Sequence, residues 1–483
     1  MSVNGGISLV SWGHSLFLWG VNYYLSFFME VNYYVDRSYS IVVKISITDM
    51  QDKRLAHLHT WGCQMNSHDT EKIAGILKGQ GYALTADPES AELIILNTCS
   101  IREKARHKFY SYLGYLARLK KRRPFIRIGV AGCIAQHEGS HIHDLNKAVD
   151  FSFGPQNIMK LADLLRSESF SAAVEDNDAI ATTDLPAERD NGIRALVSIM
   201  YGCNNFCSYC VVPYTRGRER SRPYENIINE ITSLADNGYK EVTLIGQNVN
   251  SYNGGCSFAR LLRLIDKVEG IRRVRFITSH PKDFTDELIL AMAELGSVCR
   301  HVHLPMQSGS SRVLTLMNRR YDYETYIDKV RRLRLRLPDV AVTSDIIAGF
   351  PGERDDDHEQ TISALTEIEF DGIFAFKYSM RPNTKAASMD DQVDEGVKSK
   401  RLQEILRCQD AITERKNKAL EGSVTEVLVD GRSETDPNSW VGRTSTNKVV
   451  NFSSTDCLQS ALFLNVRIVK AYRHTLEGEV IGG

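Results

Sequence analysis

The sequence YGCNNFCSYC (residues 201–210) contains three cysteines with the spacing C-x3-C-x2-C. Three cysteine sulfurs in one short loop can bind three irons of a 4Fe-4S cluster, because such clusters are held by thiolates. A cluster of this kind usually takes four thiolates, so its fourth iron would stay open to a reacting molecule. Structural zinc is the alternative, but it prefers four ligands in C-x2-C pairs. The spacing therefore favours an iron–sulfur site at Cys203, Cys207 and Cys210.

Three more cysteines occur in a pattern that repeats between residues 54 and 150. Each repeat is an apolar strand, then a cysteine, then a helical segment; the strands are expected at 55–61, 93–96 and 126–130. This alternation predicts a parallel α/β sheet, and ligands of such sheets gather at the carboxyl ends of the strands. We therefore expect Cys63, Cys99 and Cys133 to meet there. The alternative is that all three are small buried hydrophobic residues.

From residue 195 onward the alternation of strands and helices starts again. Strands are expected near 196–200, 241–245, 274–278, 301–305, 340–347 and 373–378. Six such units predict a partial (β/α)6 barrel whose chemistry lies at the carboxyl ends of its strands. The C-x3-C-x2-C loop follows the first of these strands, where a catalytic loop is expected.

A charged helix at about 397–420 precedes a segment of different character. Residues 422–483 are short β-rich pieces separated by turns, which predicts a small β-barrel of a kind that often binds oligonucleotides. This segment has six Lys or Arg and seven Asp or Glu, a net charge of −1. RNA binding there would need local patches, or base stacking on Trp440, Phe452 and Tyr472.

The composition of the 483 residues is that of an ordinary soluble globular protein, with 42% hydrophobic and 25% charged residues and a net charge of −1. Ten cysteines are too sparse for a disulfide scaffold. Basic residues are concentrated at 101–127, with ten Lys or Arg and one acid, and at Arg216, Arg218, Arg220 and Arg222. Such clusters suit contacts with phosphates, whereas a solvated helix face is the alternative.

Residues 1–52 differ from the rest. The aromatic and apolar segment 7–28 has no preceding Lys or Arg, so it lacks the charged start of a signal peptide. Three interpretations remain: a non-native extension with Met50 as the natural start, a disordered tail, or a membrane anchor. The polar residues that interrupt the segment make it a poor membrane span.

Several short motifs together resemble one known family. They are WGCQMN (61–66), NTC (97–99), AGC (131–133), the cysteine loop, GQNVNSY (246–252), HLPMQSGS (303–310), GFPGE (349–353) and NKVVNF (447–452). From about residue 53 to the end, the chain resembles the radical S-adenosylmethionine methylthiotransferases. The resemblance implies an atypical N-terminal extension (1–52), an N-terminal methylthiotransferase domain with an auxiliary cluster (53–167), a linker (168–191), a radical S-adenosylmethionine core (192–421) and a TRAM-like β-barrel (422–483).

The resemblance also implies two 4Fe-4S clusters. Cys203, Cys207 and Cys210 would hold the cluster that cleaves S-adenosylmethionine to a radical, and Cys63, Cys99 and Cys133 would hold the auxiliary one. S-adenosylmethionine would serve both as radical source and as methyl donor. Its expected contacts are Gln247, Asn248, Asn250 and Gly349, while His303, Gln307 and Glu353 are weaker candidates for the pocket.

Within the family, the motifs are most similar to those of enzymes that act on N6-isopentenyladenosine next to the anticodon of tRNA. The alternatives are threonylcarbamoyl-adenosine in tRNA, an aspartate of a ribosomal protein, or a metal-bearing RNA-binding protein without activity. The expected partners are this tRNA and an electron donor of the flavodoxin or ferredoxin type. We expect a cytoplasmic monomer without membrane contact, and the sulfur donor is not indicated.

Overall fold

The computed structural model describes residues 8–12, 15–19, 54–99, 103–189, 192–434, 436–454, 458 and 460–481. Two units are distinguished, Met1–Lys53 and Arg54–Gly483. In the first, strands β1 (Ser8–Trp12) and β2 (Ser15–Trp19) pair antiparallel. Our other expectations for residues 1–52 lie outside the described residues. None of the described helices has both the length and the apolar character needed to cross a bilayer.

The second unit begins with a parallel sheet of six strands in the order β4-β3-β5-β6-β7-β8. Its elements are β3 (Arg54–Trp61), α1 (Gln64–Gly79), β4 (Tyr82–Leu84), β5 (Leu93–Thr98), α2 (Glu103–Arg122), β6 (Arg127–Gly132), α3 (Cys133–Glu138), α4 (His141–Leu145), β7 (Phe151–Phe153), η2 (Pro155–Lys160), α5 (Leu161–Leu164) and β8 (Ser171–Ala173). The predicted parallel sheet is thus present. Residues 168–191, expected as a linker, contain β8 and η3 (Asp178–Ala181); a three-residue Ser-Ala-Ala strand has no periodicity to predict it.

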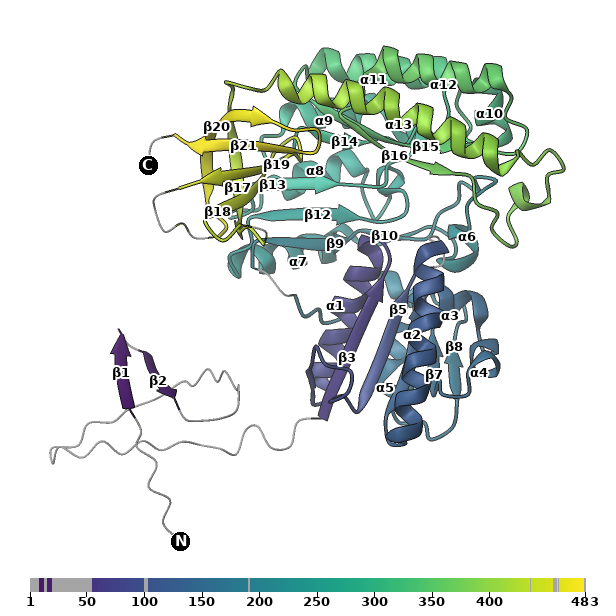
Figure 1. Cartoon of the computed structure of the whole chain (residues 1–483), viewed down its shortest axis with the longest axis vertical. Helices are drawn as coiled ribbons and strands as arrows, with labels where there is room; N and C mark the ends of the chain where they lie inside the picture. The colour runs from purple at the N-terminus through teal and green to yellow at the C-terminus, as the bar shows by residue number, and fades with distance from the viewer. Residues whose placement is uncertain are drawn as a thin grey trace, which may run out of the picture. The chain divides into compact units, whose positions relative to one another are not determined.

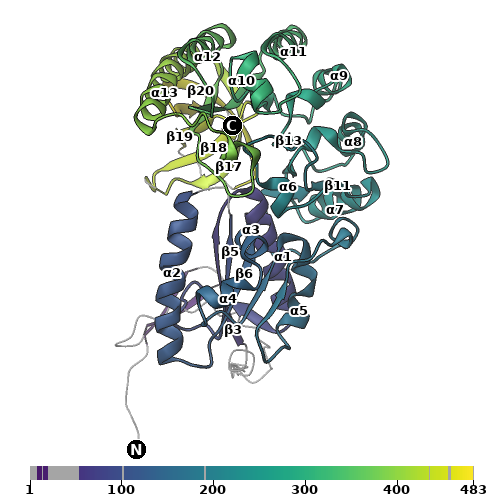
Figure 2. The same cartoon turned by 90° about the vertical axis from the view of Figure 1, so that its right-hand side faces the viewer.

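Both faces of this sheet are covered, which explains why β5 is buried at every position. Side chains alternate across a strand, so Ile94 and Leu96 pack on α2 while Leu93 and Ile95 pack on the side of α1 and α5. Figure 2 shows α2 on one side of the sheet and α1 with α5 on the other. This arrangement aligns the carboxyl ends of β3, β5 and β6 at one edge.

The middle of the chain forms a half barrel of six parallel strands (Figure 1). The strands are β9 (Arg194–Ser198), β12 (Glu241–Ile245), β13 (Arg273–Phe276), β14 (His301–His303), β15 (Ala341–Ala348) and β16 (Gly372–Lys377). They form two sheets, β13-β12-β9 and β14-β15-β16, with a parallel bridge between Val274 and Val298. The predicted partial barrel is confirmed, and β9 and β16 are its open edges.

Several helices of the half barrel begin at conventional capping residues. They are α6 (Val212–Thr215), α7 (Tyr224–Asp236), α8 (Phe258–Ile265), α9 (Asp286–Glu294), α10 (Ser311–Leu316), α11 (Tyr323–Arg336), α12 (Asp355–Ile368) and α13 (Glu395–Lys418). Short elements between them are β10 (Met200–Tyr201), β11 (Arg220–Ser221), η4 (Val249–Ser251), η5 (Pro281–Asp283) and η6 (Lys385–Ser388). Ser257, Thr285 and Asp322 each accept a hydrogen bond from a backbone N–H of the first turn, which satisfies a donor that the helix itself cannot.

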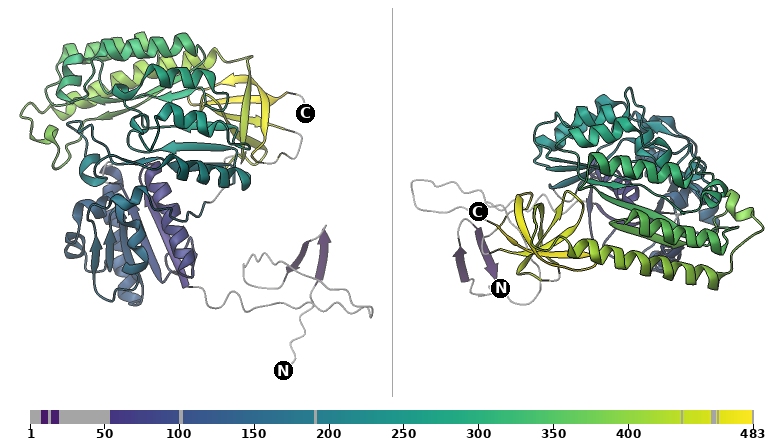
Figure 3. Two further views of the ribbon diagram at one scale, coloured as in Figure 1. Left: turned by 180° about the vertical axis from the view of Figure 1, so that it is seen from behind. Right: turned by 90° about the horizontal axis from the view of Figure 1, so that it is seen from above.

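The last part of the chain is a closed barrel of five strands, called here the small barrel. Its strands are β17 (Val424–Arg432), β18 (Ser439–Thr444), β19 (Val449–Ser453), β20 (Phe463–Ala471) and β21 (Thr475–Val480). This confirms the predicted β-barrel. Figure 3 shows that α13 leads along the half barrel to it.

Two arginines at the amino end of β13 fasten the small barrel to the half barrel. The Arg273 guanidinium donates to the Arg443 carbonyl (2.7 Å) and to the Glu426 carbonyl (3.0 Å). Arg275 donates to Glu241 (3.0 Å) and to the carbonyls of Thr444 (2.6 Å) and Ser445 (2.9 Å). Arg275 and Glu241 are both buried, so the interface contains an ion pair without access to water.

We expect Arg275→Met to destabilise the protein by about 3–5 kcal/mol, because the buried Glu241 carboxylate would lose its counter-charge. One Glu241 oxygen is already buried without a hydrogen-bond partner. The thermal unfolding midpoint should fall by several degrees, and protease should cut between the half barrel and the small barrel.

The matched control is Arg272→Met. Arg272 also reaches the small barrel, through Glu426 (2.8 Å), but this ion pair is exposed to solvent. It should contribute no more than about 1 kcal/mol. Equal losses of stability in the two variants would show that the contribution of the Arg275 pair to stability does not depend on its burial.

Candidate functional site: two groups of three cysteines

The cysteine loop (residues 201–210) leaves the carboxyl end of the first half-barrel strand through the short strand β10. Gly202 begins the turn with φ +71°, and a Cβ there would lie 1.9 Å from the Arg218 carbonyl oxygen. Phe206 also has positive φ, at +48°. Two left-handed positions within five residues let the chain curl, so that its cysteines point to a common centre.

The three thiols of this loop are held close together and away from water. Cys203 and Cys207 are buried, and Cys210 is half-buried. Burial raises the pKa of Cys203, and burial together with the neighbouring Cys207 raises the pKa of Cys210 to about 12. Such thiols stay protonated and are therefore poor nucleophiles. A metal that replaces their protons would stabilise the thiolates and so offset the cost of burying them.

The rest of the half barrel supports this loop from its other end. Ser208 donates its N–H to the Met317 carbonyl (3.0 Å) and its hydroxyl to the Leu316 carbonyl (2.8 Å). The buried Arg319 lies 3.4 Å from the Cys207 sulfur, measured from its Nη1, and also donates to the Pro305 carbonyl (3.0 Å). Sequence reasoning did not identify Arg319, which is nine residues beyond the end of the nearest quoted motif, HLPMQSGS (303–310).

The second group of cysteines lies at the strand ends of the N-terminal sheet, as predicted. Cys63 is the residue before α1, Cys99 follows β5, and Cys133 is the first residue of α3 after β6. A hydrogen bond with Cys99 lowers the pKa of Cys63 to about 5, against the effect of burial. The pKa of Cys133 is raised, chiefly by burial and in part by Cys63. These mutual effects show that the three sulfurs are neighbours.

Two buried asparagines position this second group. Asn66 accepts hydrogen bonds from the N–H and the sulfur of Cys63, both at 3.3 Å. Its amide donates to Asn97 (3.2 Å) and to the Thr98 carbonyl (3.3 Å), and Asn97 donates back to the Asn66 carbonyl (2.8 Å). The loops after β3 and β5 are therefore tied to each other. Both asparagines lay in quoted motifs, but nothing in the sequence indicated that they pair.

Arg216 connects the two groups. It lies six residues after Cys210, and its Nη2 donates to Asp69 of α1 (2.8 Å) in a pair that is almost fully buried. Its positive charge opposes the rise in the pKa of Cys133, so it faces the second group. Its Nη1 is buried without a hydrogen-bond partner. A buried N–H donor beside thiols suits an anionic cluster, whose sulfurs accept hydrogen bonds.

The expectation that the arginines after the cysteine loop contact phosphates is wrong for at least two of them. Arg216 is buried against Asp69, and Arg222 is buried against Glu230 (2.7 Å) and the Ser198 carbonyl (2.7 Å). Arg220 pairs with Asp178. Asp69 and Asp178 are 147 and 42 residues away from their arginines, so the run of arginines alone looked like a surface.

Base stacking on Trp440 and Phe452 is also ruled out, because both are core residues of the small barrel. A closed barrel of five strands needs large side chains to fill its interior. Tyr472 is the exposed one of the three aromatic candidates, with 44% of its surface accessible.

Gln247 and Asn248, two of the predicted S-adenosylmethionine contacts, lie directly after β12 and beside the cysteine loop. Gln247 accepts a hydrogen bond from the Gly202 N–H (2.5 Å), and Asn248 donates to Asp283 (2.8 Å). The Gln247 amide nitrogen and the Asn248 amide oxygen are buried without partners. Unsatisfied buried polar atoms of opposite type suit a ligand with both donors and acceptors.

The structure shows that Asn250 and Gly349 each have a role in the fold itself. Asn250 exchanges two hydrogen bonds with the backbone of His280, at 2.8 and 2.9 Å. Gly349 has φ +70°, and a Cβ there would lie 2.3 Å from the Lys398 side chain of α13. Glu353 is neither at the surface nor open to a ligand, because it pairs with the buried Arg401 (2.9 Å).

Among the weaker candidates, His303 lines the inner face of the half barrel. Its ring lies 3.1 Å from the Thr343 hydroxyl and 3.5 Å from Asp345. Gln307 is buried and has positive φ, at +73°, with its N–H on the Asp345 carbonyl (2.8 Å).

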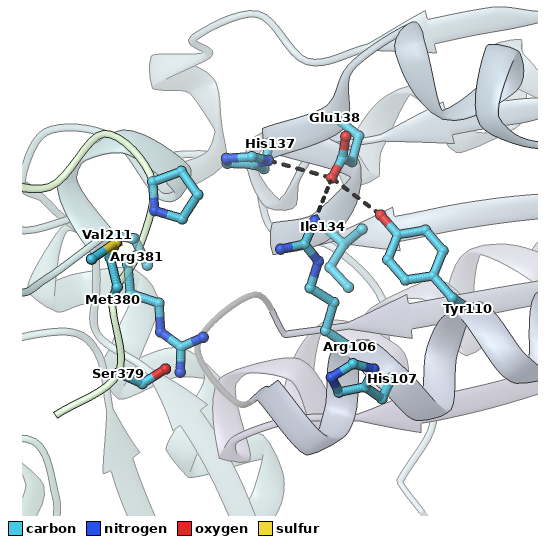
Figure 4. A pocket seen from close by; sticks show the side chains of 11 residues that line it. Arg106, His107, Tyr110, Ile134, His137, Glu138, Val211, Ser379, Met380 and Arg381 are labelled. Atoms are coloured by element: carbon cyan, nitrogen blue, oxygen red, sulfur yellow. Dashed lines mark hydrogen bonds and ion pairs between the residues drawn. The ribbon is translucent and has the colours of Figure 1, made fainter. Parts of the chain in front are cut away.

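A cavity of about 390 Å³ is lined on one side by residues of α2 and α3 and on the other by residues that follow the cysteine loop and β16 (Figure 4). Its lining residues are Arg106, His107, Tyr110, Ile134, His137, Glu138, Val211, Ser379, Met380, Arg381 and Pro382. Ile134 is next to Cys133, and Val211 is next to Cys210. Figure 4 shows Arg106 and Arg381 on opposite walls. The volume is within the range of small-ligand pockets.

In the part of the chain that the structure describes, no three His, Cys, Asp or Glu side chains are placed to hold one metal ion. A cube differs from a single ion in that each thiolate binds its own iron, so its ligands lie further apart. Two groups of three neighbouring cysteines, each with an arginine beside it, suit such a cube.

Three family models match the chain. They are the Radical SAM superfamily at residues 197–365, the Uncharacterized protein family UPF0004 at 55–154 and the TRAM domain at 418–481. Among solved structures, the radical S-adenosylmethionine methyltransferase TsrM from Kitasatospora setae matches with a TM-score of 0.54 at 15% identity, over 69% of this chain and 75% of that one. At this identity the likeness concerns the fold.

Similar sequences extend over nearly the whole length of both proteins. A protein named tRNA-2-methylthio-N(6)-dimethylallyladenosine synthase from Thermodesulfovibrio yellowstonii is 49% identical over 89% of this chain and 99% of its own. Proteins of the same name from Syntrophus aciditrophicus and Caldicellulosiruptor saccharolyticus are 48% and 47% identical, over 95% and 92% of their lengths and 89% and 88% of this chain. The chain therefore belongs to the radical S-adenosylmethionine methylthiotransferases, in the family of the tRNA-2-methylthio-N(6)-dimethylallyladenosine synthases.

Proposed function

We propose that this protein transfers a methylthio group to C2 of N6-isopentenyladenosine at position 37 of tRNA, beside the anticodon. The observation that carries the proposal is the cavity of about 390 Å³, which is bordered by the neighbours of both Cys133 and Cys210. A carbon that must first lose hydrogen and then gain sulfur has to reach both groups of cysteines from one position. The names of the 47–49% identical relatives support the same substrate.

We assign one 4Fe-4S cluster to Cys203, Cys207 and Cys210 and a second to Cys63, Cys99 and Cys133. When bound, these clusters and S-adenosylmethionine supply a radical able to take hydrogen from C2, whose C–H is too weakly acidic for a base, and a methylated sulfur to replace it. The protein's own part is to hold the thiols, to exclude water and to fix the substrate between them.

Gln247 and Asn248 are the residues we propose to bind S-adenosylmethionine directly, because each leaves a buried polar atom without a partner. Asn250 would act indirectly, because it holds the loop after β13 through the His280 backbone. Gly349 would also act indirectly, because it leaves room for the Lys398 side chain of α13. Radical chemistry needs electrons from outside, so we propose a donor of the flavodoxin or ferredoxin type, and action in the cytoplasm on tRNA.

Nucleoside mass spectrometry of tRNA from a deletion strain tests the proposed function. The 2-methylthio group should disappear from isopentenyladenosine and return when the gene is restored. If threonylcarbamoyl-adenosine loses its methylthio group instead, the substrate is wrong; if no tRNA nucleoside changes, the function is wrong.

Cysteine variants separate the roles of the two groups. Cys203→Ala should abolish cleavage of S-adenosylmethionine, whereas Cys99→Ala should retain part of it and form no methylthio product. The measurements are deoxyadenosine release and iron content, which should fall from about eight irons per chain toward about four in either variant.

Cys408→Ala is the matched control, because Cys408 is half-buried on α13 and distant in sequence from both groups. It should keep all its iron and activity. Full methylthio product from either Cys203→Ala or Cys99→Ala would defeat the assignment.

Alkylation of the metal-free protein should distinguish the two groups. Cys63 and Cys210 are both half-buried, but the pKa of Cys63 is lowered to about 5 and that of Cys210 is raised to about 12. The thiolate is the reacting form, so at pH 7 iodoacetamide should modify Cys63 well before Cys210.

Peptide mass mapping would measure both rates. Loading with iron and sulfide should protect both residues, because metal-bound thiolates are blocked. Equal rates at Cys63 and Cys210 in the folded metal-free protein would contradict the described electrostatics.

A further inference from the structure

The edge strand β16 and the residues just after it expose large apolar side chains that do not pack in the core. Phe374 is 60% exposed and Phe376 is 53% exposed, and Met380, just after the strand, is 55% exposed. Ile373 and Ala375 alternate with the two phenylalanines and pack into the core under the helices. Side chains alternate across a strand, so Phe374 and Phe376 share the opposite, inner face of the half barrel.

Contacts on β15 and β14 confirm this orientation. In the sheet, Phe374 is paired with Asp345 and Phe376 with Ile347. Asp345 faces His303 on the inner face, and the His303 and Phe374 rings are 6.0 Å apart. Because β16 is an open edge of the half barrel, this inner face is accessible from the side.

The apolar strip Phe374–Phe376–Met380 runs from the interior of the half barrel to the cavity. Tyr378, two residues after Phe376, packs on Phe350 (5.5 Å between ring centres). Phe350 in turn packs on Tyr209 of the cysteine loop (6.4 Å). Met380 is itself a lining residue of the cavity, as Figure 4 shows. The strip therefore ends at the cavity that Ile134 and Val211, the sequence neighbours of Cys133 and Cys210, also line.

The cavity adds positive charge to the end of this strip. Arg106 and Arg381 lie on its two walls, and the exposed His107 lies beside Arg106. Glu138, on the same wall as Arg106, lies 3.6 Å from it, so the lining has one more arginine than acid. An apolar strip that ends beside two arginines suits a nucleotide whose base carries an apolar substituent and whose backbone carries phosphates. Monomeric proteins rarely expose several large apolar side chains together without a binding role.

We propose that Phe374, Phe376 and Met380 bind the isopentenyl-adenine group itself, while Arg106 and Arg381 contact the neighbouring phosphates. This inference rests on the proposed function and names the residues that select its substrate. Adenine can stack on a phenylalanine ring, and the branched five-carbon chain has no polar atom to satisfy. A threonylcarbamoyl group carries a carboxylate, which an apolar strip would leave without a partner.

The experiment compares RNA affinities of the cluster-loaded enzyme. Two anticodon stem–loop RNAs are used, identical except that one carries isopentenyladenosine and the other plain adenosine. Each buried methylene contributes about a fourfold gain in affinity, so the wild-type protein should prefer the isopentenylated RNA by at least about tenfold. Phe374→Ala and Phe376→Ala should reduce this preference to roughly threefold or less. Loss of a stacking ring would weaken the binding of both RNAs, so the quantity compared is the ratio of the two affinities.

Leu335→Ala is the matched control, because Leu335 is an apolar residue on the outer helix α11 whose exposed fraction (80%) exceeds that of either phenylalanine. It should keep the full preference. Iron content and the thermal midpoint of each variant show whether it is folded. If both phenylalanine variants keep the wild-type preference, the proposal is overturned.

A measurement on the wild-type protein keeps the proposal testable if a variant fails to load iron. RNA with threonylcarbamoyl-adenosine should bind no better than the plain RNA, and equal affinity for the two modified RNAs would overturn the proposal. The two levels of failure remain distinct. A wild-type enzyme that does not methylthiolate isopentenylated RNA refutes the proposed function, whereas one that does so while its variants keep the preference refutes only this inference.

Discussion

The buried ion pair between Arg216 and Asp69 determines how the two groups of cysteines face each other. Asp69 lies on the helix that starts after Cys63, and Arg216 lies just beyond Cys210. A buried pair adds little stability by itself, but removal of one partner costs about 3–5 kcal/mol. Lys72 strengthens the same contact through hydrogen bonds to Tyr201 (2.7 Å) and Ser198 (3.2 Å). Any rotation of the N-terminal sheet against the half barrel would separate these buried charges.

The sequence predicted what depends on backbone regularity and missed what depends on remote partners. Parallel strands align their carboxyl ends whatever their side chains, so the meeting of Cys63, Cys99 and Cys133 followed from the repeat alone. The small barrel was also predicted from local regularity, namely short β-rich pieces separated by turns. Burial of Arg216 could not be predicted, because Asp69 is 147 residues away and no local pattern indicates it.

The candidate ligand residues also show which features the sequence predicted and which depend on remote partners. The position of Gln247 after the second half-barrel strand was predictable, whereas the hydrogen bond from Gly202 that leaves its other amide atom unpaired was not. Gly349 was expected to contact S-adenosylmethionine, whereas the structure shows that glycine is needed there because Lys398 of α13 approaches closely. Motif position therefore located the site, and only packing decided which atoms are available to a ligand.

The small barrel and the cysteine loop lie at opposite ends of the same strands. Arg273 and Arg275 hold the small barrel at the amino end of β13, while the cysteine loop follows the carboxyl end of β9. Strand β12 lies between β13 and β9, and its five residues span about 15 Å at about 3.3 Å per residue. This length separates the small barrel from the cysteine loop. An RNA that contacts both must therefore lie along the half barrel, and β16 is one of its two open edges. That is the edge where Phe374 and Phe376 are exposed, so the path of an RNA and the apolar strip coincide.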